Sequence, residues 1–190
     1  MVIELLSQAF QAEPVMRWIF PEERRRRTLL PALFDVLFAE HLAAHGETLV
    51  SDDDGTADGV LLYVPPGPPR PPADRAARFA ARLEAAVGPY AERAVTAFDT
   101  LAGRHPYAPA HYHVAYCAVR PGRQGRGIGG ALLRGVLERA DLDGVGTYAE
   151  SSSARLLGLN VRHGFSPLPE IPLPDAGPVV RPAWREPVGP

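Results

Sequence analysis

The chain has 190 residues, of which 46% are hydrophobic, enough apolar material for one core, so we expect a single α/β (or α+β) domain over residues 1–190. The formal net charge of −2 argues against a general nucleic-acid-binding protein, which needs excess cationic charge to neutralise phosphates. Cys117 is the only cysteine, which excludes an intramolecular disulfide and a cysteine-rich zinc site, and we expect no metal centre. We see no signal-peptide pattern and no apolar stretch of membrane length, and therefore expect no membrane association and a cytoplasmic protein.

The first quarter of the sequence predicts two helices. Apolar residues at helical spacing indicate a helix over residues 2–12 that Pro14 ends, followed by a short apolar segment at residues 18–20. A second apolar stripe over residues 29–42 indicates an amphipathic helix. The four consecutive arginines at residues 24–27 precede this stripe, and we interpret them as solvated surface at a helix start.

The next segment predicts a hairpin, a spacer and more helix. Two short β-like runs, at residues 47–51 and 59–64, flank the Asp and Gly residues of Asp52–Gly55, which favour a hairpin turn over a metal-binding loop. Residues 65–72 are rich in proline and indicate a stiff extended spacer. Residues 74–103 are expected to be helical, with a break at an internal Gly-Pro pair.

The last third can hold uninterrupted secondary structure, because no proline occurs from Gly122 to Ser166. The expected elements, in chain order, are a strand over Tyr112–Val119, a helix over Gly127–Ala140, a strand over Val145–Glu150, a helix over Ser153–His163, and strands over Phe165–Ile171 and Val179–Trp184.

A glycine-rich loop, residues 120–126, joins the first of these strands to the helix that follows. The start of a helix presents unpaired backbone N–H groups and the positive end of the helix dipole, and both favour a phosphate or pyrophosphate. Glycines in and after the loop would let such a ligand approach the backbone closely. Arg123 and Arg126 are expected to add positive charge at its rim.

A dinucleotide-binding fold is one alternative for this loop. Gly125, Gly127 and Gly130 match the G-x-G-x-x-G pattern, and Glu150 lies at the spacing of a ribose-binding carboxylate. In that fold the glycine turn begins directly at the end of the strand, whereas here residues 120–124 intervene. Too little chain follows for the rest of a doubly wound sheet, so we set this alternative aside.

The sequence resembles the GNAT superfamily of N-acetyltransferases in two places. Residues 124–129, QGRGIG, match its Q/R-x-x-G-x-G/A signature, and Glu150–Phe165 is similar to its second strand and helix. Together these matches define a cofactor core of about residues 111–165. More weakly, the front half resembles the branch that contains puromycin N-acetyltransferase, on Ala9, Phe10, Glu13, Pro14, Trp18, Phe20, Pro21 and the Val64–Pro66 segment.

The resemblance implies a fold, a co-substrate and an acceptor. The fold would be a central mixed, splayed β-sheet flanked by helices. Acetyl-CoA would bind with its pantetheine arm along the strand at Cys117, Ala118 and Val119. Its pyrophosphate would lie on the backbone of Gln124, Gly125, Arg126, Gly127, Ile128, Gly129 and Gly130. A small-molecule primary amine would attack the thioester directly, in a pocket built by the acceptor-side segments 1–110 and 166–190.

The resemblance also suggests catalytic residues. His113 lies where some relatives place a glutamate base, and Glu150 and His111 are the alternatives. Asn160 occupies the position where many relatives have a tyrosine acid, and Tyr116 or Tyr148 could substitute for it. Because asparagine is no proton donor to a thiolate, a non-catalytic acyl-CoA-binding module is the second hypothesis. The oligomeric state stays open between a monomer and a homodimer.

Overall fold

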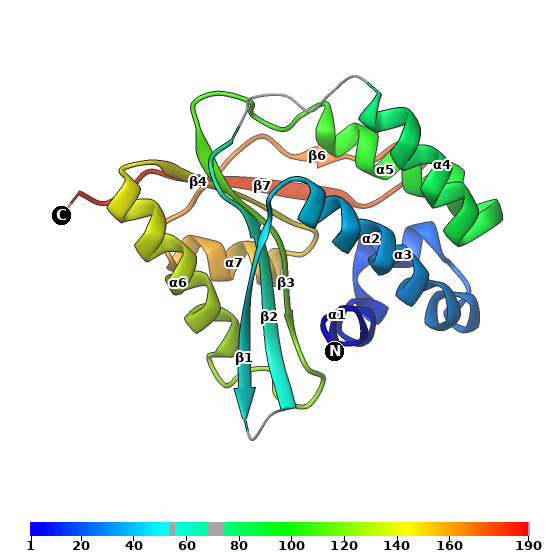
Figure 1. The fold of residues 1–190 in the computed structure, drawn as a ribbon, viewed down its shortest axis with the longest axis horizontal. Helices are drawn as coiled ribbons and strands as arrows, with labels where there is room; N and C mark the ends of the chain where they lie inside the picture. The colour runs from blue at the N-terminus through cyan, green and yellow to red at the C-terminus, as the bar shows by residue number, and fades with distance from the viewer. Residues whose placement is uncertain (54–55, 68–73, 190) are drawn as a thin grey trace.

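A mixed β-sheet forms the centre of the molecule (Figure 1). The computed structural model describes residues 1–53, 56–67 and 74–189, and within them seven strands pair in the order β1-β2-β3-β4-β7-β5, with β6 also on β7. The strands are β1 (Glu47–Asp53), β2 (Thr56–Val64), β3 (His111–Val119), β4 (Gly146–Ser151), β5 (Ser166–Pro167), β6 (Ile171–Pro172) and β7 (Val179–Arg185). Only β3 and β4 pair in parallel among these described strands. The expected fold class is confirmed.

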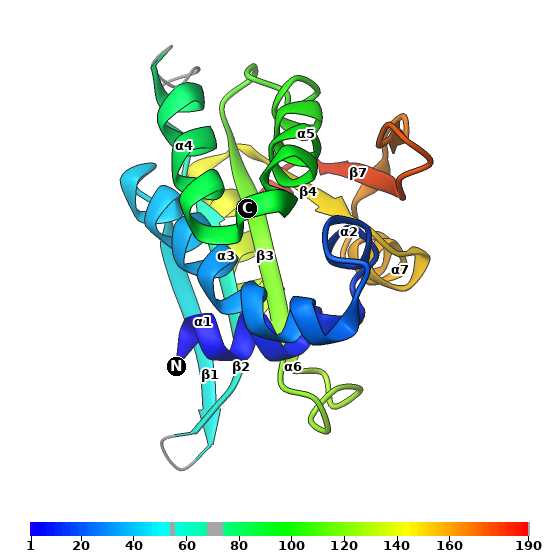
Figure 2. The ribbon, with the colours of Figure 1, turned by 90° about the vertical axis from the view of Figure 1, so that its right-hand side faces the viewer.

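Helices cover both faces of this sheet (Figure 2). They are α1 (Val2–Ala9), α2 (Pro14–Ile19), α3 (Glu23–Ala43), α4 (Arg75–Val87), α5 (Ala91–Ala102), α6 (Ile128–Asp143) and α7 (Ala154–Arg162), with 3₁₀ turns at Phe10–Ala12 and Gly88–Tyr90. The expected break in the helix over residues 74–103 is therefore present. In the described part of the chain, no helix combines the length and apolar character needed to cross a membrane.

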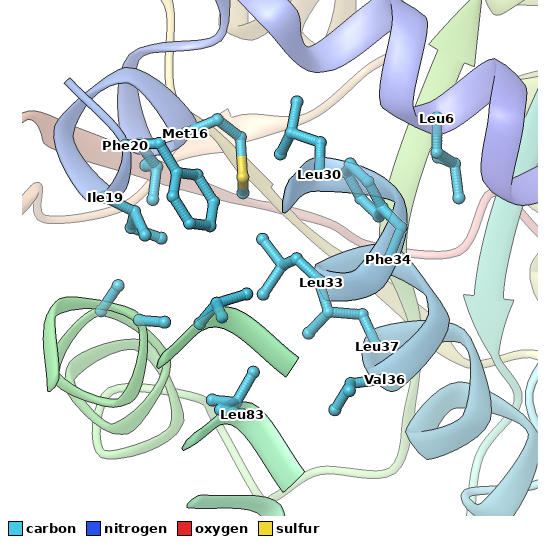
Figure 3. Packing of buried hydrophobic residues seen from close by; sticks show 14 of the residues in the cluster. Leu6, Met16, Ile19, Phe20, Leu30, Leu33, Phe34, Val36, Leu37 and Leu83 are labelled. Atoms are coloured by element: carbon cyan, nitrogen blue, oxygen red, sulfur yellow. The ribbon is translucent and has the colours of Figure 1, made fainter. Parts of the chain in front are cut away.

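The larger hydrophobic core lies between the sheet and helices α1 to α5. Its centre is a stripe of fully buried residues on α3, among them Leu30, Leu33 and Phe34, which packs against Leu83 of α4 and against Phe20, directly after α2 (Figure 3). Fully burying a side chain of this size contributes about 1.5–3 kcal/mol. The front half of the chain is therefore a packed layer that holds α1 and α2 against the sheet.

One arginine of the 24–27 run belongs to the interior, which corrects the expectation that the whole run is solvated. Arg26 is buried within α3 and donates from Nε to the Gln11 carbonyl and from Nη1 to the Phe20 carbonyl, each at 2.7 Å. These hydrogen bonds join α3 to the 3₁₀ turn that contains Gln11 and to the end of α2 at Phe20. A charged donor satisfying buried carbonyls explains why burial of Arg26 is tolerated.

The second core lies on the opposite face, under α6 and α7. Leu133, Val136 and Leu137 of α6 pack on β2, β3 and β4, and Leu157 of α7 joins the edge of this cluster. Residues that alternate along β2 divide between the two cores, with Leu61 in this one. The sheet is thus covered on both faces, as its apolar strands require.

Two expectations from the sequence were wrong in detail. Residues 18–20 are not a separate apolar segment, because Pro14 begins α2 at the first helical position, where its missing N–H costs nothing. The expected strand over residues 165–171 is two short pieces, β5 and β6, because prolines within it cannot donate to a continuous ladder. The 54–55 turn and residues 68–72 of the expected spacer lie outside the described residues.

Candidate active site

Strands β3 and β4 diverge in the middle of the sheet. Their last ladder pair joins Val114 to Ala149, although β3 continues to Val119 and β4 to Ser151. Beyond that pair, the backbone of β3 on the β4 side has no ladder partner among the described strands. The sheet therefore opens into a splay, bordered by residues 115–119 on one strand and by Glu150 and Ser151 on the other.

A bulge in β3 lies at the start of the splay. Tyr63 pairs with Val114 and Leu62 with Tyr116, so Ala115 is the extra residue of β3. The bulge changes the alternation of side chains, because Val114 and Cys117 both contact the α6 core whereas Tyr116 packs on the α1 to α5 core. Tyr116 thereby faces the same side of the sheet as His113.

The glycine loop opens onto the first turn of α6. Gly122, Gly125 and Gly127 have φ of +86°, +80° and +83°, a conformation that other residues rarely adopt. Gly127 is the N-cap of α6 and has no side chain to cap it, so the N–H groups of Ile128 and Gly129 have no intrahelical acceptor. A Cβ at Gly125 or Gly127 would meet no atom within 4 Å. The loop thus offers open space and donors suited to an anion.

Buried Asp58 anchors this loop to β2. The Asp58 carbonyl accepts from Arg120 N at 2.8 Å, and its carboxylate Oδ1 lies 3.2 Å from Arg123 Nε. The Arg120 side chain donates twice to the Ala57 carbonyl. Arg123 therefore holds the loop against the sheet, which differs from the expected role at the ligand rim. Arg126 is exposed and forms no ion pair with any residue that the structure describes.

Close packing brings the start of α6 onto the strands. A Cβ at Gly59 would lie 2.6 Å from Ile128 Cγ2, so only glycine lets this turn approach β2. At Gly129, a Cβ would be 3.7 Å from Cys117 Sγ. The predicted loop residues and the predicted strand residues 117–119 are therefore neighbours. Burial raises the pKa of Cys117 to about 12, which keeps the thiol protonated and unreactive.

Glu150 lies at the mouth of the splay on the other strand. Burial raises the pKa of its carboxyl to about 7, and a hydrogen bond of 2.9 Å from the Tyr148 hydroxyl to Oε1 opposes part of this shift. A carboxyl that titrates near neutral pH can both accept and release a proton under cellular conditions. Glu150 therefore has the protonation behaviour of a general base.

His113 and His111 belong to a ring cluster with His105 and Tyr148. The His113 and His105 ring centroids are 4.7 Å apart, and His111 Nε2 lies 3.3 Å from His105 Nε2. Burial, followed by the neighbouring histidines, lowers the pKa of His113 to about 3, and its buried Nε2 has no hydrogen-bond partner in the described structure. Described His, Cys, Asp and Glu residues form no group suited to hold a metal ion.

Asn160 ties α7 to the end of β4. Its side-chain Nδ2 donates to Ser151 Oγ at 3.1 Å, and its backbone carbonyl accepts from His163 N and Phe165 N. The side chain is buried beside the splay. Through these contacts Asn160 fixes the local structure, at the position where the family resemblance implied a tyrosine acid.

Sequence reasoning about the site missed Glu13. This residue precedes α2, and its Oε2 accepts from Met16 N at 2.8 Å. Burial raises the pKa of its carboxyl, and the nearby Ser152 side chain opposes part of this shift. Ser152 directly follows β4, so a residue near the start of the chain reaches the splay. A signal was present in Pro14, because proline is common at the first position of a helix, and the residue before it is then the N-cap.

The family model of the acetyltransferase (GNAT) family matches residues 12–165. This chain belongs to the GNAT family. Among solved structures, a Corynebacterium glutamicum protein described as histone acetyltransferase HPA2 and related acetyltransferase is 28% identical, with a TM-score of 0.73, and the match covers 100% of this chain and 91% of that one.

Two further structures share the GNAT fold at low identity. Arylalkylamine N-acetyltransferase 2 from Aedes aegypti is 14% identical with a TM-score of 0.64, and the match covers 97% of this chain and 92% of that one. A polyamine N-acetyltransferase from Drosophila melanogaster is 16% identical with a TM-score of 0.60, covering 96% and 91%. A search of curated proteins found no match. As a GNAT acetyltransferase, the protein is an acyltransferase enzyme.

Proposed function

We propose that this enzyme transfers an acetyl group from acetyl-CoA to a primary amine of a small molecule, by direct attack of the amine on the thioester carbon, within one domain spanning residues 1–190. The observation that carries the proposal is the splay between β3 and β4. It has an anion-binding helix start on one side and a carboxyl with a pKa of about 7 on the other. A place for the acetyl donor and a base for the amine would therefore lie at the same opening of the sheet.

The residues around the loop fit acetyl-CoA. The backbone from Gln124 to Gly130 would hold the pyrophosphate, since its glycines leave open space above the helix start. Residues 117–119, whose ladder toward β4 is missing, would hold the pantetheine arm through their free backbone groups. A backbone N–H in this segment would polarise the thioester carbonyl, the chemistry that the bound group supplies.

We propose Glu150 as the general base in preference to His113 or His111. An alkylammonium with a pKa near 10 lies about three units from neutrality at pH 7, a barrier of roughly 4 kcal/mol if no base helps. A base works best when its own pKa is near the working pH. The pKa of Glu150 is about 7, whereas that of His113 is about 3, so His113 holds a transferred proton poorly.

The departing group is a thiolate, and because a thiol has a pKa near 8.5, it can leave with less help from an acid than an alkoxide could. Tyr116 and Tyr148 do not suit this role, because burial raises the pKa of both hydroxyls well above that of a thiol. Asn160 can donate a hydrogen bond but no proton. We therefore propose that the proton which Glu150 takes from the amine returns to the sulfur, directly or through water.

The acceptor side is built from α1, α2 and the β6–β7 hairpin, which meet in one core. We propose a small amine, in keeping with the resemblance of the front half to the puromycin N-acetyltransferase branch. Solved structures that share the fold include enzymes named for polyamine and arylalkylamine acetylation, and a protein described as histone acetyltransferase HPA2 and related acetyltransferase. A protein amine is therefore the competing acceptor.

The test is release of free thiol from acetyl-CoA, measured with a panel of small amines, with a lysine-containing histone peptide, and with no acceptor. We expect amine-dependent release that saturates, with the acetylated amine as product. Saturable acetyl-CoA binding without turnover on any acceptor would contradict the proposal, and turnover on the peptide alone would replace the small amine.

A further inference from the structure

Asp58 brings a buried negative charge to the loop that we propose for the pyrophosphate, which is itself an anion. Asp58 is 5% exposed, and its carboxylate Oδ1 lies 3.2 Å from Nε of Arg123 in the loop. The next residue, Gly59, is where β2 approaches the start of α6, since a Cβ there would lie 2.6 Å from Ile128 Cγ2. Like charges repel, so the charge of Asp58 alone would weaken the binding of an anion here. Its place beside the loop therefore calls for another role.

A tight turn at the start of the loop brings two arginines onto Asp58. Arg123 N donates to the Arg120 carbonyl at 2.9 Å, and the two central residues are Pro121 and Gly122, the latter with φ of +86°. Proline followed by a glycine of positive φ is the pattern of a type II turn. Both ends of the turn meet the same carboxylate oxygen, with Arg123 Nε at 3.2 Å and Arg120 Nε at 3.9 Å.

Hydrogen bonds to the backbone of β2 hold one end of this turn independently of the carboxylate. Arg120 N donates to the Asp58 carbonyl at 2.8 Å, and the Arg120 side chain donates from Nε and Nη2 to the Ala57 carbonyl at 3.0 and 2.7 Å. The carboxylate therefore acts mainly on the other end, at Arg123. The Asp58 side chain is 8% exposed and that of Arg123 is 37% exposed, so this ion pair is partly shielded from water and salt.

Resting on the proposed function, we infer that Asp58 is a positioning residue for acetyl-CoA, which through Arg123 holds the loop against β2 and so fixes the start of α6 in its binding conformation. The unpaired N–H groups of Ile128 and Gly129 then face the ligand in an arrangement that exists before it binds. Less conformational freedom is lost on binding, and this gain exceeds the repulsion between Asp58 and the pyrophosphate.

The deciding experiment is a calorimetric titration of acetyl-CoA into the wild type and into Asp58→Asn. This substitution keeps the size of the side chain and the backbone carbonyl for Arg120, and removes only the charge. Charge alone predicts tighter binding of an anion to the variant, whereas positioning predicts weaker binding, and we expect Kd to rise about 10-fold. Unchanged or tighter binding would overturn the inference. A wild type that binds no acetyl-CoA would instead remove the proposed function.

Steady-state kinetics gives a readout that a loss of stability would not move. In Asp58→Asn, KM for acetyl-CoA should rise about 10-fold while kcat and KM for the amine stay within about 3-fold of wild type. Asp141→Asn is the matched control, the same substitution at a carboxylate that binds Arg185 at 2.7 Å near the other end of α6. It should lower the thermal stability without changing either KM. An equal rise of KM for acetyl-CoA in both variants would overturn the inference.

Arg123→Gln keeps the inference testable if Asp58→Asn does not fold. A positioning contact acts before the ligand arrives, so the hydrogen-bonded backbone amides of residues 120 and 123 should exchange with solvent about 10-fold faster in the free variant than in the free wild type. Acetyl-CoA should also bind about 10-fold more weakly. Weaker binding with unchanged amide exchange would show that the Arg123 side chain contacts the ligand itself, and would overturn the inference, as would unchanged binding.

Discussion

Val114 and Ala149 form the last ladder pair between β3 and β4, and the two halves of the proposed site begin just beyond that pair, one on each strand. One residue past Ala149 is Glu150, the carboxyl with a pKa of about 7. Past Val114, the bulged strand leads to residues 117–119 and the glycine loop. Both sides of the opening are therefore positioned by regular secondary structure, which favours a rigid site.

Replacing the proposed base should slow chemistry without weakening acetyl-CoA binding. Glu150→Gln keeps an oxygen for the Tyr148 hydrogen bond and removes the titrating group. We expect kcat to fall by roughly 10² to 10⁴, and the rise of kcat/KM with pH, centred near pH 7 in the wild type, to disappear. His113→Phe serves as control and should stay within about 10-fold of wild type. The reverse ranking of these two variants would assign the base to His113.

The raised pKa of Glu150 also predicts how stability depends on pH. Its carboxyl ionises near 4.5 in the unfolded chain but near 7 in the folded protein, so its favourable contribution is complete below about pH 4.5 and is lost as pH rises to about 7. Relative to wild type, Glu150→Gln should gain stability between pH 4 and pH 8, on the order of 3 kcal/mol. Chemical denaturation at pH 4, 6 and 8 measures this difference.

That comparison has a built-in control for the histidines. The pKa of His105 is lowered to about 4 and that of His113 to about 3, so their contribution is present above about pH 6.5 and is lost as pH falls. Both proteins contain these histidines, so the contribution cancels in the difference. A pH-independent difference between wild type and variant would contradict the assigned pKa of Glu150.

The glycine loop can be tested with two glycines of the same helix. Gly127 and Gly144 cap the two ends of α6 with φ of +83° and +66°, and a Cβ at either would meet no atom within 4 Å. Alanine at each position should lower the free energy of unfolding by about 1–2 kcal/mol. Calorimetry should show acetyl-CoA affinity reduced roughly 10-fold or more by Gly127→Ala only. Equal affinities in both variants would separate the loop from acetyl-CoA binding.

Asn160 should prove structural. Asn160→Ala leaves Ser151 Oγ without its buried partner, and we expect a loss of about 1–3 kcal/mol in thermal or chemical unfolding. Turnover measured below the unfolding temperature should remain within about 10-fold of wild type. A kcat reduced by 100-fold or more at unchanged stability would instead show that the amide contacts the departing sulfur.

The strands and helices between residues 112 and 163 were predicted well from the sequence. Their apolar periodicity is long, and proline, which would interrupt a helix or strand, is absent from residues 122–166. It failed at Pro14, which ends one helix and begins another. A proline can either end a helix or stand at the first position of the next one, and the hydrogen bond from Met16 N to the Glu13 side chain, which marks the second case, is seen only in the structure.

The site was predicted less completely than the fold. The glycine loop is local and was found as a motif, whereas the close approach of Gly59 on β2 to Ile128 on α6 joins residues far apart in the sequence. Arg123 was expected near the ligand, but buried Asp58, which no local pattern singles out, holds it to β2. Likewise the low pKa of His113 comes from burial against His105, which only the packed structure reveals.

The bulge at Ala115 absorbs one extra residue of β3 without exchanging the faces of the strand beyond it. Leu62 pairs with Tyr116 and Tyr63 with Val114, so the two residues of each pair still face the same side of the sheet. If Ala115 instead took a regular place in the ladder, every later side chain of β3 would change faces, and the Tyr116 phenol would turn toward α6. The bulge therefore keeps the phenol on the proposed acceptor side and the neighbouring thiol under α6.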